Sequence, residues 1–148
     1  PAAEHDDLVS AYHRRLTGND EDEQLRCAYA WAQWESNTIS LLPTAAKALT
    51  LADRDAVLSF ARIENHYFKH AGFMEEGQLL REAHRLADIP TIIIQGRYDC
   101  CTPAKTAWEL SKAMPHAAFH LIPDAGHAFN EPGILAALLD ATDKFATL

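Results

Sequence analysis

Apolar residues recur at helical spacing through the first part of the chain. A stripe from Leu8 to Leu16 predicts one helix, and a second stripe, from Leu25 towards Ile39, predicts another. A third helix is predicted to start near Asp53 and to end at Gly72, because glycine is a common residue after a helix C-terminus. Residues 1–86 are therefore predicted to be all-helical.

The pattern changes near residue 87. Thr91–Gln95 is a short β-branched run between a proline and a glycine, which is typical of a strand buried on both faces. Thr102 and Pro103 start a predicted helix that ends near Met114, and Ala117–Ile122 reads as a second strand. A strand, helix, strand unit of this length predicts two parallel, adjacent strands whose carboxyl ends share one edge of the sheet. A last helix opens near Glu131 and is predicted to bury Ile134, Leu135, Leu138, Leu139 and Phe145.

Two parallel strands do not make a finished sheet, because such sheets need helices on both faces and more strands to exclude water. The fold class is therefore predicted as α/β, with the chain forming the C-terminal part of a larger protein. Residues 1–86 would be a helical domain, incomplete at its start, and residues 87–148 would hold the last two strands of the main sheet. Apolar faces on the strands and on the last helix are expected to be exposed in this piece alone.

Charge and composition exclude several classes of function. The 148 residues carry 13 Lys and Arg against 21 Asp and Glu, a formal net charge of −8, which disfavours nucleic acid and anionic membranes as partners. No apolar run approaches the roughly 20 residues of a membrane span, and residues 1–7 lack the pattern of a signal peptide. Three cysteines, two of them adjacent, favour reduced thiols and a cytoplasmic location.

An acid and a histidine follow the two predicted strands. Asp99 lies in the loop after the first strand and His127 in the loop after the second, at the edge where open α/β sheets bind ligands. Such a pair can share a hydrogen bond that fixes the histidine tautomer for proton transfer. Either residue alone is more simply a helix cap or a loop residue, but their joint placement favours a catalytic acid and base.

The chain shows no nucleophile to complete such a triad. Its serines are Ser10, Ser36, Ser40, Ser59 and Ser111. None has the GxSxG flanks of a nucleophile elbow, and no glycine-rich HGG-type loop offers an oxyanion hole. Cys100 and Cys101 are interpreted as small packed or pocket-lining residues rather than as substitute nucleophiles.

Two glutamates lie on apolar faces of the predicted helices. Glu35 shares a side with part of one apolar stripe, and Glu64 is centred on the apolar face of the third helix. A buried carboxylate needs a cation or good donors, so a structural ion pair with Arg62, Arg97 or another basic residue is about as favoured as a receptor for a substrate ammonium. The i, i+4 pair of His66 and His70 has a metal-ligand spacing, but a surface histidine pair is the simpler interpretation.

Four sequence segments together resemble one enzyme family. They are Trp-Ala-Gln-Trp-Glu at 31–35, Ala-Arg-Ile-Glu-Asn-His-Tyr-Phe at 61–68, Gly-Arg-Tyr-Asp at 96–99, and Ala-Gly-His at 125–127 followed by Glu-Pro. In these segments the chain closely resembles the proline iminopeptidases, also called prolyl aminopeptidases, which are serine peptidases of the α/β-hydrolase fold. The resemblance covers essentially the whole chain and matches the C-terminal half of the family. It implies a helical cap for residues 1–86 and the end of the catalytic domain for residues 87–148.

The resemblance also implies roles for single residues. Asp99 would be the triad acid and His127 the base, Glu35 and Glu64 would bind the α-amino group of an N-terminal proline, and Phe68 would line the pocket for its ring. The substrate would be a small peptide with a free N-terminal proline, and no metal or organic cofactor would be required. The serine and the oxyanion hole would come from a missing N-terminal half, in the same or a separate chain, so the isolated chain is expected to be inactive.

Two other functions remain open. An esterase or epoxide-type hydrolase could have the same acid and histidine, with the glutamates in structural ion pairs. Alternatively, the chain could be an inactive helical interaction fragment that keeps the fold without the nucleophile. One departure from the family pattern is Thr102, which stands between Cys101 and Pro103 where many relatives place a cysteine directly before the proline.

Overall fold

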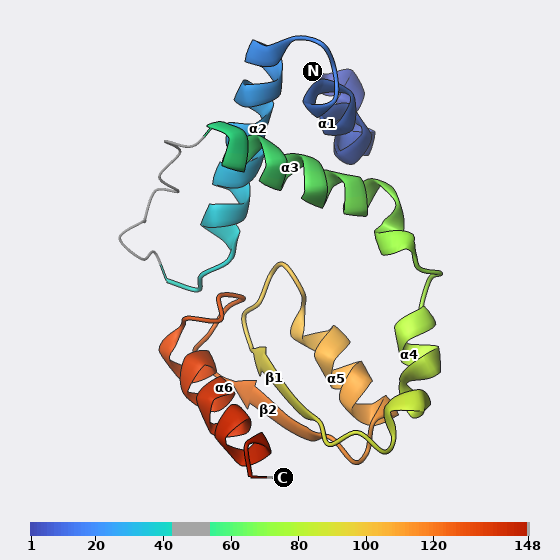
Figure 1. The fold of residues 1–148 in the computed structure, drawn as a ribbon, viewed down its shortest axis with the longest axis vertical. Helices are drawn as coiled ribbons and strands as arrows, with labels where there is room; N and C mark the ends of the chain where they lie inside the picture. Colours follow the sequence, from blue (N-terminus) through green and yellow to red (C-terminus); the bar gives the residue numbers. More distant parts are fainter. Residues whose placement is uncertain (43–53, 148) are drawn as a thin grey trace. The chain divides into compact units, whose positions relative to one another are not determined.

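A computed structural model of the protein describes residues 1–42 and 54–147, which form two compact units (Figure 1). The first unit contains the described residues of Pro1–Ser36 and Ala45–Glu76. The second contains those of Asn37–Thr44 and Gly77–Leu148. Among the residues that the structure describes, no helix combines the length and the apolar character that a membrane crossing requires.

The first unit is helical, as the sequence predicts. Its helices are the 3-10 helix η1 (Ala2–Asp7), α1 (Leu8–Leu16), α2 (Glu21–Thr38, whose last two residues belong to the second unit), α3 (Arg54–Lys69) and the 3-10 helix η2 (Ala71–Phe73). Asp7 caps α1 by accepting a hydrogen bond from the Ser10 N–H at 2.9 Å. Asp20 accepts hydrogen bonds from two N–H groups in the first turn of α2. Asp53, where the third helix was predicted to start, lies outside the described residues.

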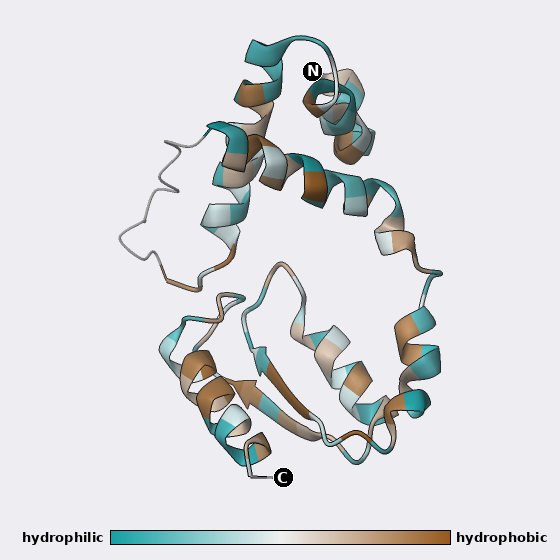
Figure 2. Ribbon diagram, viewed as in Figure 1, coloured by the Kyte–Doolittle hydropathy of each residue, from teal (hydrophilic) through white to brown (hydrophobic). Residues whose placement is uncertain are grey.

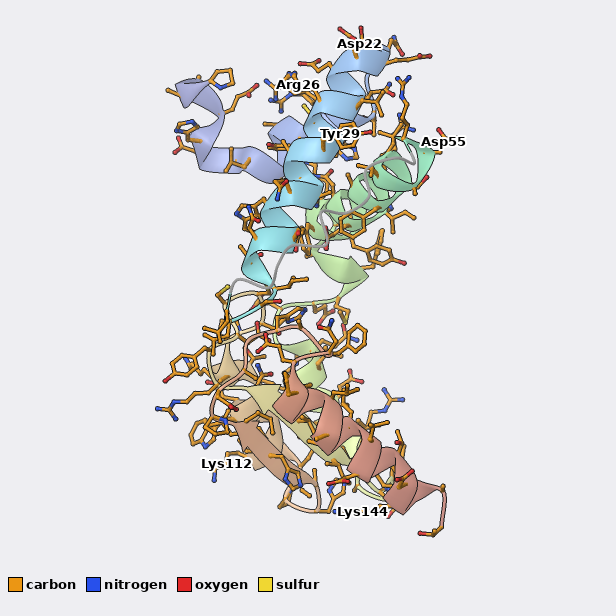
Figure 3. The ribbon with its side chains drawn as sticks, turned by 90° about the vertical axis from the view of Figure 1, so that its left-hand side faces the viewer. Asp22, Arg26, Tyr29, Asp55, Lys112 and Lys144 are labelled. Carbon is orange, nitrogen blue, oxygen red and sulfur yellow. The ribbon has the colours of Figure 1, made fainter. Side chains whose placement is uncertain are left out.

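Small residues build the core of the helical unit. Ala28 and Ala32 of α2 and Ala61 of α3 are fully buried. They belong to one cluster together with larger apolar side chains. The buried members of this cluster are Leu16, Cys27, Ala28, Trp31, Ala32, Val57 and Ala61. Asp22 and Arg26, which Figure 3 labels on α2, are exposed. Helix α2 thus has one buried side and one polar side, as its sequence pattern predicts.

The second unit contains a two-stranded parallel sheet. Its elements are α4 (Gln78–Glu82), the 3-10 helix η3 (Ala83–Leu86), β1 (Ile92–Gly96), α5 (Ala104–Ala113), β2 (Ala118–Ile122) and α6 (Pro132–Phe145). The strands pair in parallel, with Ile92 opposite Ala118 and Gly96 opposite Ile122. Helices α5 and α6 both contact the strands and lie on opposite sides of them in Figure 1. The predicted strand, helix, strand unit is therefore confirmed.

Apolar faces of the second unit are exposed. Of the five apolar residues that α6 was predicted to bury, only Ile134 is buried, while Leu135 and Leu139 are 40% and 56% exposed. The prediction of complete burial was wrong for this chain, because α6 packs with one side on two strands only. Figure 2 shows hydrophobic residues along α6 and both strands, and Leu121 of β2 is also exposed. The expectation that the last helix and the strands expose apolar surface is confirmed.

The compact units divide at a different place from the predicted domains. The division falls between Glu76 and Gly77 rather than after residue 86. Helix α4 and η3 group with the sheet because both contact α5. The described part of the segment after α2 also belongs to the second unit, and it contacts the loop after β2. The interpretation of the helical unit as the cap of an enzyme stays a prediction.

Candidate functional site

The loops that follow β1 and β2 are joined by backbone hydrogen bonds. Because the strands are parallel and adjacent, both loops leave the same edge of the sheet. The Arg97 N–H donates to the Ile122 carbonyl at 2.9 Å, and the Tyr98 N–H donates to the Ala125 carbonyl at 2.9 Å. These bonds hold the Asp99 loop against the His127 loop.

Gly96 is required where these loops approach each other. A Cβ atom at this position would lie 1.9 Å from the Gly126 carbonyl oxygen and 2.8 Å from the Ala125 carbonyl oxygen. Both neighbours are backbone atoms, so no side-chain rotation could make room. The close approach therefore depends on the missing side chain of this glycine.

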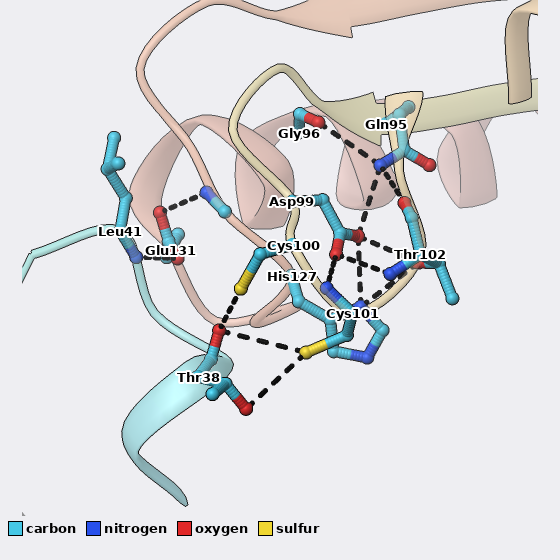
Figure 4. A network of polar contacts seen from close by, with 11 residues as sticks. Thr38, Leu41, Gln95, Gly96, Asp99, Cys100, Cys101, Thr102, His127 and Glu131 are labelled. Carbon is cyan, nitrogen blue, oxygen red and sulfur yellow. Dashed lines mark hydrogen bonds and ion pairs between the residues drawn. The ribbon is translucent and has the colours of Figure 1, made fainter. Parts of the chain in front are cut away.

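Asp99 and His127 are in direct contact, as the sequence predicts (Figure 4). Oδ2 of Asp99 lies 2.9 Å from Nδ1 of His127. The Asp99 side chain is 4% exposed, whereas the His127 side chain is 41% exposed. A buried carboxylate thus supports an accessible imidazole, which is the arrangement that proton transfer to a bound molecule needs.

Five donors surround the Asp99 carboxylate. Oδ1 accepts hydrogen bonds from the backbone N–H groups of Cys101 and Thr102, at 2.9 and 2.8 Å. Oδ2 accepts from the Gln95 amide at 3.0 Å, from the Thr102 hydroxyl at 2.8 Å and from the His127 ring. Burial alone would raise the pKa of Asp99, but the hydrogen bonds, led by that of the Thr102 N–H, outweigh it and hold the pKa below its ordinary value.

The charge on Asp99 determines the tautomer of His127. An ionised carboxylate can only accept hydrogen bonds, so Nδ1 of His127 carries the ring proton. In the neutral ring, Nε2 is then unprotonated and able to take a proton. The pair therefore has the chemistry of a general base with its orienting acid.

Glu131 fixes the backbone of the histidine loop, and sequence reasoning did not assign it this role. Its Oε2 accepts a hydrogen bond from the Gly126 N–H at 2.9 Å, and its Oε1 accepts one from the Leu41 N–H at 3.0 Å (Figure 4). The N–H groups of His127 and Ala128 both donate to the Ile39 carbonyl, at 2.9 and 2.7 Å. The segment after α2 is thereby tied to the histidine loop.

Gln95 and Thr102 were also missed as parts of the site. The Gln95 amide nitrogen donates to Asp99 and to the carbonyls of Gly96 and Thr102. In the sequence, Gln95 is a polar residue at the end of an apolar strand, and Thr102 is a polar residue shortly after Asp99. Such a pattern indicates a polar loop, but it does not predict which atoms form hydrogen bonds.

The helical unit places Glu64 and Phe68 around Trp31. The Trp31 indole N–H donates to Oε2 of Glu64 at 2.6 Å, and the rings of Trp31 and Phe68 lie with centroids 5.9 Å apart. Trp31 is 8% exposed, Glu64 is partly buried, and Phe68 is half exposed. Glu35 lies one helical turn after Trp31 on α2 and is also partly buried.

A structural ion pair between Glu64 and Arg62 is absent among the described residues. The Arg62 guanidinium instead donates to the Leu16 carbonyl at 2.7 Å and to Oε1 of Gln24 at 2.9 Å. The donor that satisfies Glu64 is a neutral indole N–H. This hydrogen bond uses one oxygen of the carboxylate, Oε2.

Comparison with known proteins identifies a fold family and several relatives of this chain. The family model of the alpha/beta hydrolase fold matches residues 11–133. The chain is 47% identical to a protein named probable proline iminopeptidase from Leptolyngbya boryana, over 98% of this chain and 46% of that protein. It is 49% identical to a proline iminopeptidase from Xanthomonas citri, over 99% of this chain and 47% of the relative. For a proline iminopeptidase from Arabidopsis thaliana, the identity is 44% over 95% of this chain and 37% of the relative.

The chain spans about half the length of the curated relatives it matches, or less. The two parallel strands with their helices, together with the match over residues 11–133, fit the C-terminal part of such a protein. The chain belongs to the alpha/beta hydrolase fold family.

Proposed function

We propose that the protein carrying this chain is a serine aminopeptidase that releases proline from the N-terminus of small peptides. The observation that carries the proposal is the contact of 2.9 Å between Asp99 and His127 at the edge of the sheet. The names of relatives that are 44–49% identical support the substrate class. Asp99 and His127 would supply the acid and the base of a Ser-His-Asp triad, and the serine would come from outside residues 1–148.

His127 would act as the proton carrier of the reaction. Its unprotonated Nε2 would take the proton of the serine hydroxyl as the oxygen attacks the prolyl carbonyl carbon. The imidazolium formed in this way would be stabilised by the negative charge of Asp99 across the 2.9 Å contact. His127 would then donate the proton to the leaving amine, and a water molecule would release proline from the acyl-enzyme by the same route.

Glu64 and Glu35 would receive the α-ammonium group of the substrate. The Trp31 N–H holds one oxygen of Glu64 in place, which leaves the other oxygen for a cation. Phe68, whose ring lies beside Trp31, would contact the ring of the proline. Selection of a free N-terminus would then follow from a charged hydrogen bond that a blocked amine cannot make.

The remaining catalytic parts would come from a preceding half of the enzyme, in the same or a separate chain. No metal or organic cofactor takes part in the proposed reaction. Because none of the five serines of residues 1–148 lies in a GxSxG motif, these residues alone are expected to be inactive.

The test uses the full-length protein that carries this chain. Prolyl-naphthylamide should be hydrolysed, whereas the N-acetylated form should not. Glu64→Gln should lower kcat/KM for the free substrate roughly 10- to 100-fold, the equivalent of a charged hydrogen bond of about 1.5–3 kcal/mol. Glu21→Gln, at an exposed position in the first turn of α2, is the matched control and should leave kcat/KM unchanged.

Three results would contradict the proposal. Equal hydrolysis of the free and acetylated substrates would favour an esterase-type hydrolase in which the glutamates have structural roles. Turnover by purified residues 1–148 alone would show that the nucleophile lies within them. A full-length protein with no hydrolase activity on prolyl or ester substrates would favour the inactive-fragment interpretation.

A further inference from the structure

The loop after β1 presents two adjacent thiols that the proposed reaction does not use. Both cysteines are exposed. The Cys100 thiol lies 3.2 Å from the Thr38 carbonyl oxygen, and the Cys101 thiol lies 3.7 Å from the same oxygen (Figure 4). Both sulfur atoms thus lie near the same carbonyl oxygen, that of the last residue of α2. Adjacent residues form a disulfide only with strain, so a shared ligand suits this pair better than a bond between them.

Cys101 also belongs to a cluster of three different metal-binding groups. One ligand atom from each of Asp99, Cys101 and His127 lies within 4.8 Å of the other two. A carboxylate oxygen, a thiol sulfur and an imidazole nitrogen are the ligands that Zn²⁺ takes in proteins, at about 2.0–2.3 Å. Small side-chain rotations would bring the three atoms to these distances from a shared cation, because the side chains of Cys101 and His127 are exposed and have room to turn.

We propose that Asp99, Cys101 and His127 form a binding site for a thiophilic divalent cation such as Zn²⁺, with the Cys100 thiol as a fourth ligand. Four ligands of this kind complete the tetrahedral coordination that Zn²⁺ prefers. The thiols select soft cations over Mg²⁺ and Ca²⁺, which take oxygen ligands. Each thiol that binds the cation releases its proton to solvent, and the sulfur–metal bond replaces the sulfur–hydrogen bond.

Occupation of this site would change the tautomer of His127. In the free pair, the ring proton is on Nδ1 and Nε2 is open. A cation on Nδ1 displaces that proton, and the neutral ring then carries its proton on Nε2. The nitrogen that would receive the serine proton is thereby blocked. The cation would also separate His127 from Oδ2 of Asp99, so its predicted effect is reversible inhibition; this consequence rests on the proposed function, whereas cation binding does not.

The experiment measures binding and activity separately in the reduced full-length protein. Cd²⁺ added alone should give a thiolate-to-metal charge-transfer absorbance that saturates at one ion per chain. Cys101→Ser should weaken binding at least 10-fold, because a ligating sulfur is lost, and Cys100→Ser should weaken it less. Cys27→Ser, which changes the buried thiol of the helical unit, is the matched control and should leave Cd²⁺ affinity unchanged.

Zn²⁺ should inhibit prolyl-naphthylamide hydrolysis at the concentration at which it displaces Cd²⁺, and a chelator should restore the rate. The inhibition constant for Cys101→Ser, measured relative to the metal-free rate of that variant, should rise at least 10-fold. Absence of the Cd²⁺ absorbance, or an unchanged Cd²⁺ affinity in Cys101→Ser, would overturn the site. Binding without inhibition in an active enzyme would overturn the placement of the cation on His127.

The binding measurement also separates this proposal from the proposed function. A full-length protein that binds Cd²⁺ through Cys101, and loses this binding on His127→Gln, but hydrolyses no prolyl substrate would support the cation site. The same result would overturn the aminopeptidase proposal alone.

Discussion

The most direct test of the proposed acid and base is Asp99→Asn in the full-length protein. Asparagine has nearly the shape of aspartate, but one of its two polar atoms is an NH₂ group that donates hydrogen bonds. Both oxygens of Asp99 accept hydrogen bonds, from the backbone N–H groups on Oδ1 and from three side chains on Oδ2. With its amide oxygen on the backbone donors, the substituted asparagine would direct its NH₂ group at Gln95, Thr102 and His127.

The expected loss of kcat in Asp99→Asn follows from the tautomer of His127. An NH₂ group opposite Nδ1 favours the ring with its proton on Nε2, which cannot accept a proton from serine. A change of this kind lowers kcat by about 10³- to 10⁴-fold. That loss corresponds to roughly 4–5.5 kcal/mol of transition-state stabilisation, at about 1.36 kcal/mol for each factor of ten. Asp124→Asn, an exposed change in the loop that precedes His127, is the matched control and should retain the wild-type kcat.

Two further measurements separate this positioning role from a structural one. The downfield proton signal of the His127 Nδ1–H should disappear from the NMR spectrum of Asp99→Asn. In thermal unfolding, Asp99 stabilises the folded protein above its ordinary pKa of about 3.9, and this stabilisation is lost as the pH falls through the lowered folded-state pKa. The difference in Tm between wild type and Asp99→Asn should therefore narrow below about pH 4. If Asp99→Asn kept more than a tenth of wild-type kcat with an intact Nδ1–H signal, Asp99 would not control the tautomer.

Three other substitutions test the contacts that hold the two candidate sites. Gly96→Ala should lower the free energy of unfolding by about 3 kcal/mol or more in chemical denaturation, because its Cβ would overlap the Gly126 carbonyl oxygen. Trp31→Phe should raise KM for prolyl-naphthylamide with a smaller effect on kcat, because Glu64 loses its indole donor; an unchanged KM would remove Glu64 from the substrate site. Glu131→Gln leaves one of two backbone N–H groups opposite an NH₂ group and should cost about 1–3 kcal/mol of stability in the same denaturation assay.

The arrangement of the strands could be predicted from sequence because periodicity and chain length determine it. An apolar run at Ile92–Ile94, a helix of suitable length and a second run leave one plausible connection, with both strand ends on one edge. That topology brings the loops of Asp99 and His127 to the same edge, where the two side chains are in contact. The predicted helix of residues 8–16 was equally accessible, because its cap and its apolar stripe are both local features.

The supporting contacts of the site could not be predicted in this way. Gln95, Thr102 and Glu131 act through hydrogen bonds whose partners depend on the path of each loop, and loop paths have no periodicity. The burial of α6 was overestimated for a related reason. An apolar pattern shows that a face favours burial, but whether a partner covers it depends on elements that the pattern does not describe.

The exposed apolar surface and the candidate catalytic pair both indicate that the sheet of the whole protein has further strands. A carboxylate with five donors that orients a half-exposed histidine is costly to assemble, since every polar atom must meet its partner. Leu121 of β2 and Leu139 of α6 remain exposed in the same unit, although apolar surface is normally covered in a folded domain. Further strands of the same sheet, with their helices, would cover such apolar surface. They would also extend the edge on which Asp99 and His127 lie, which is where a parallel sheet would present the nucleophile of the proposed triad.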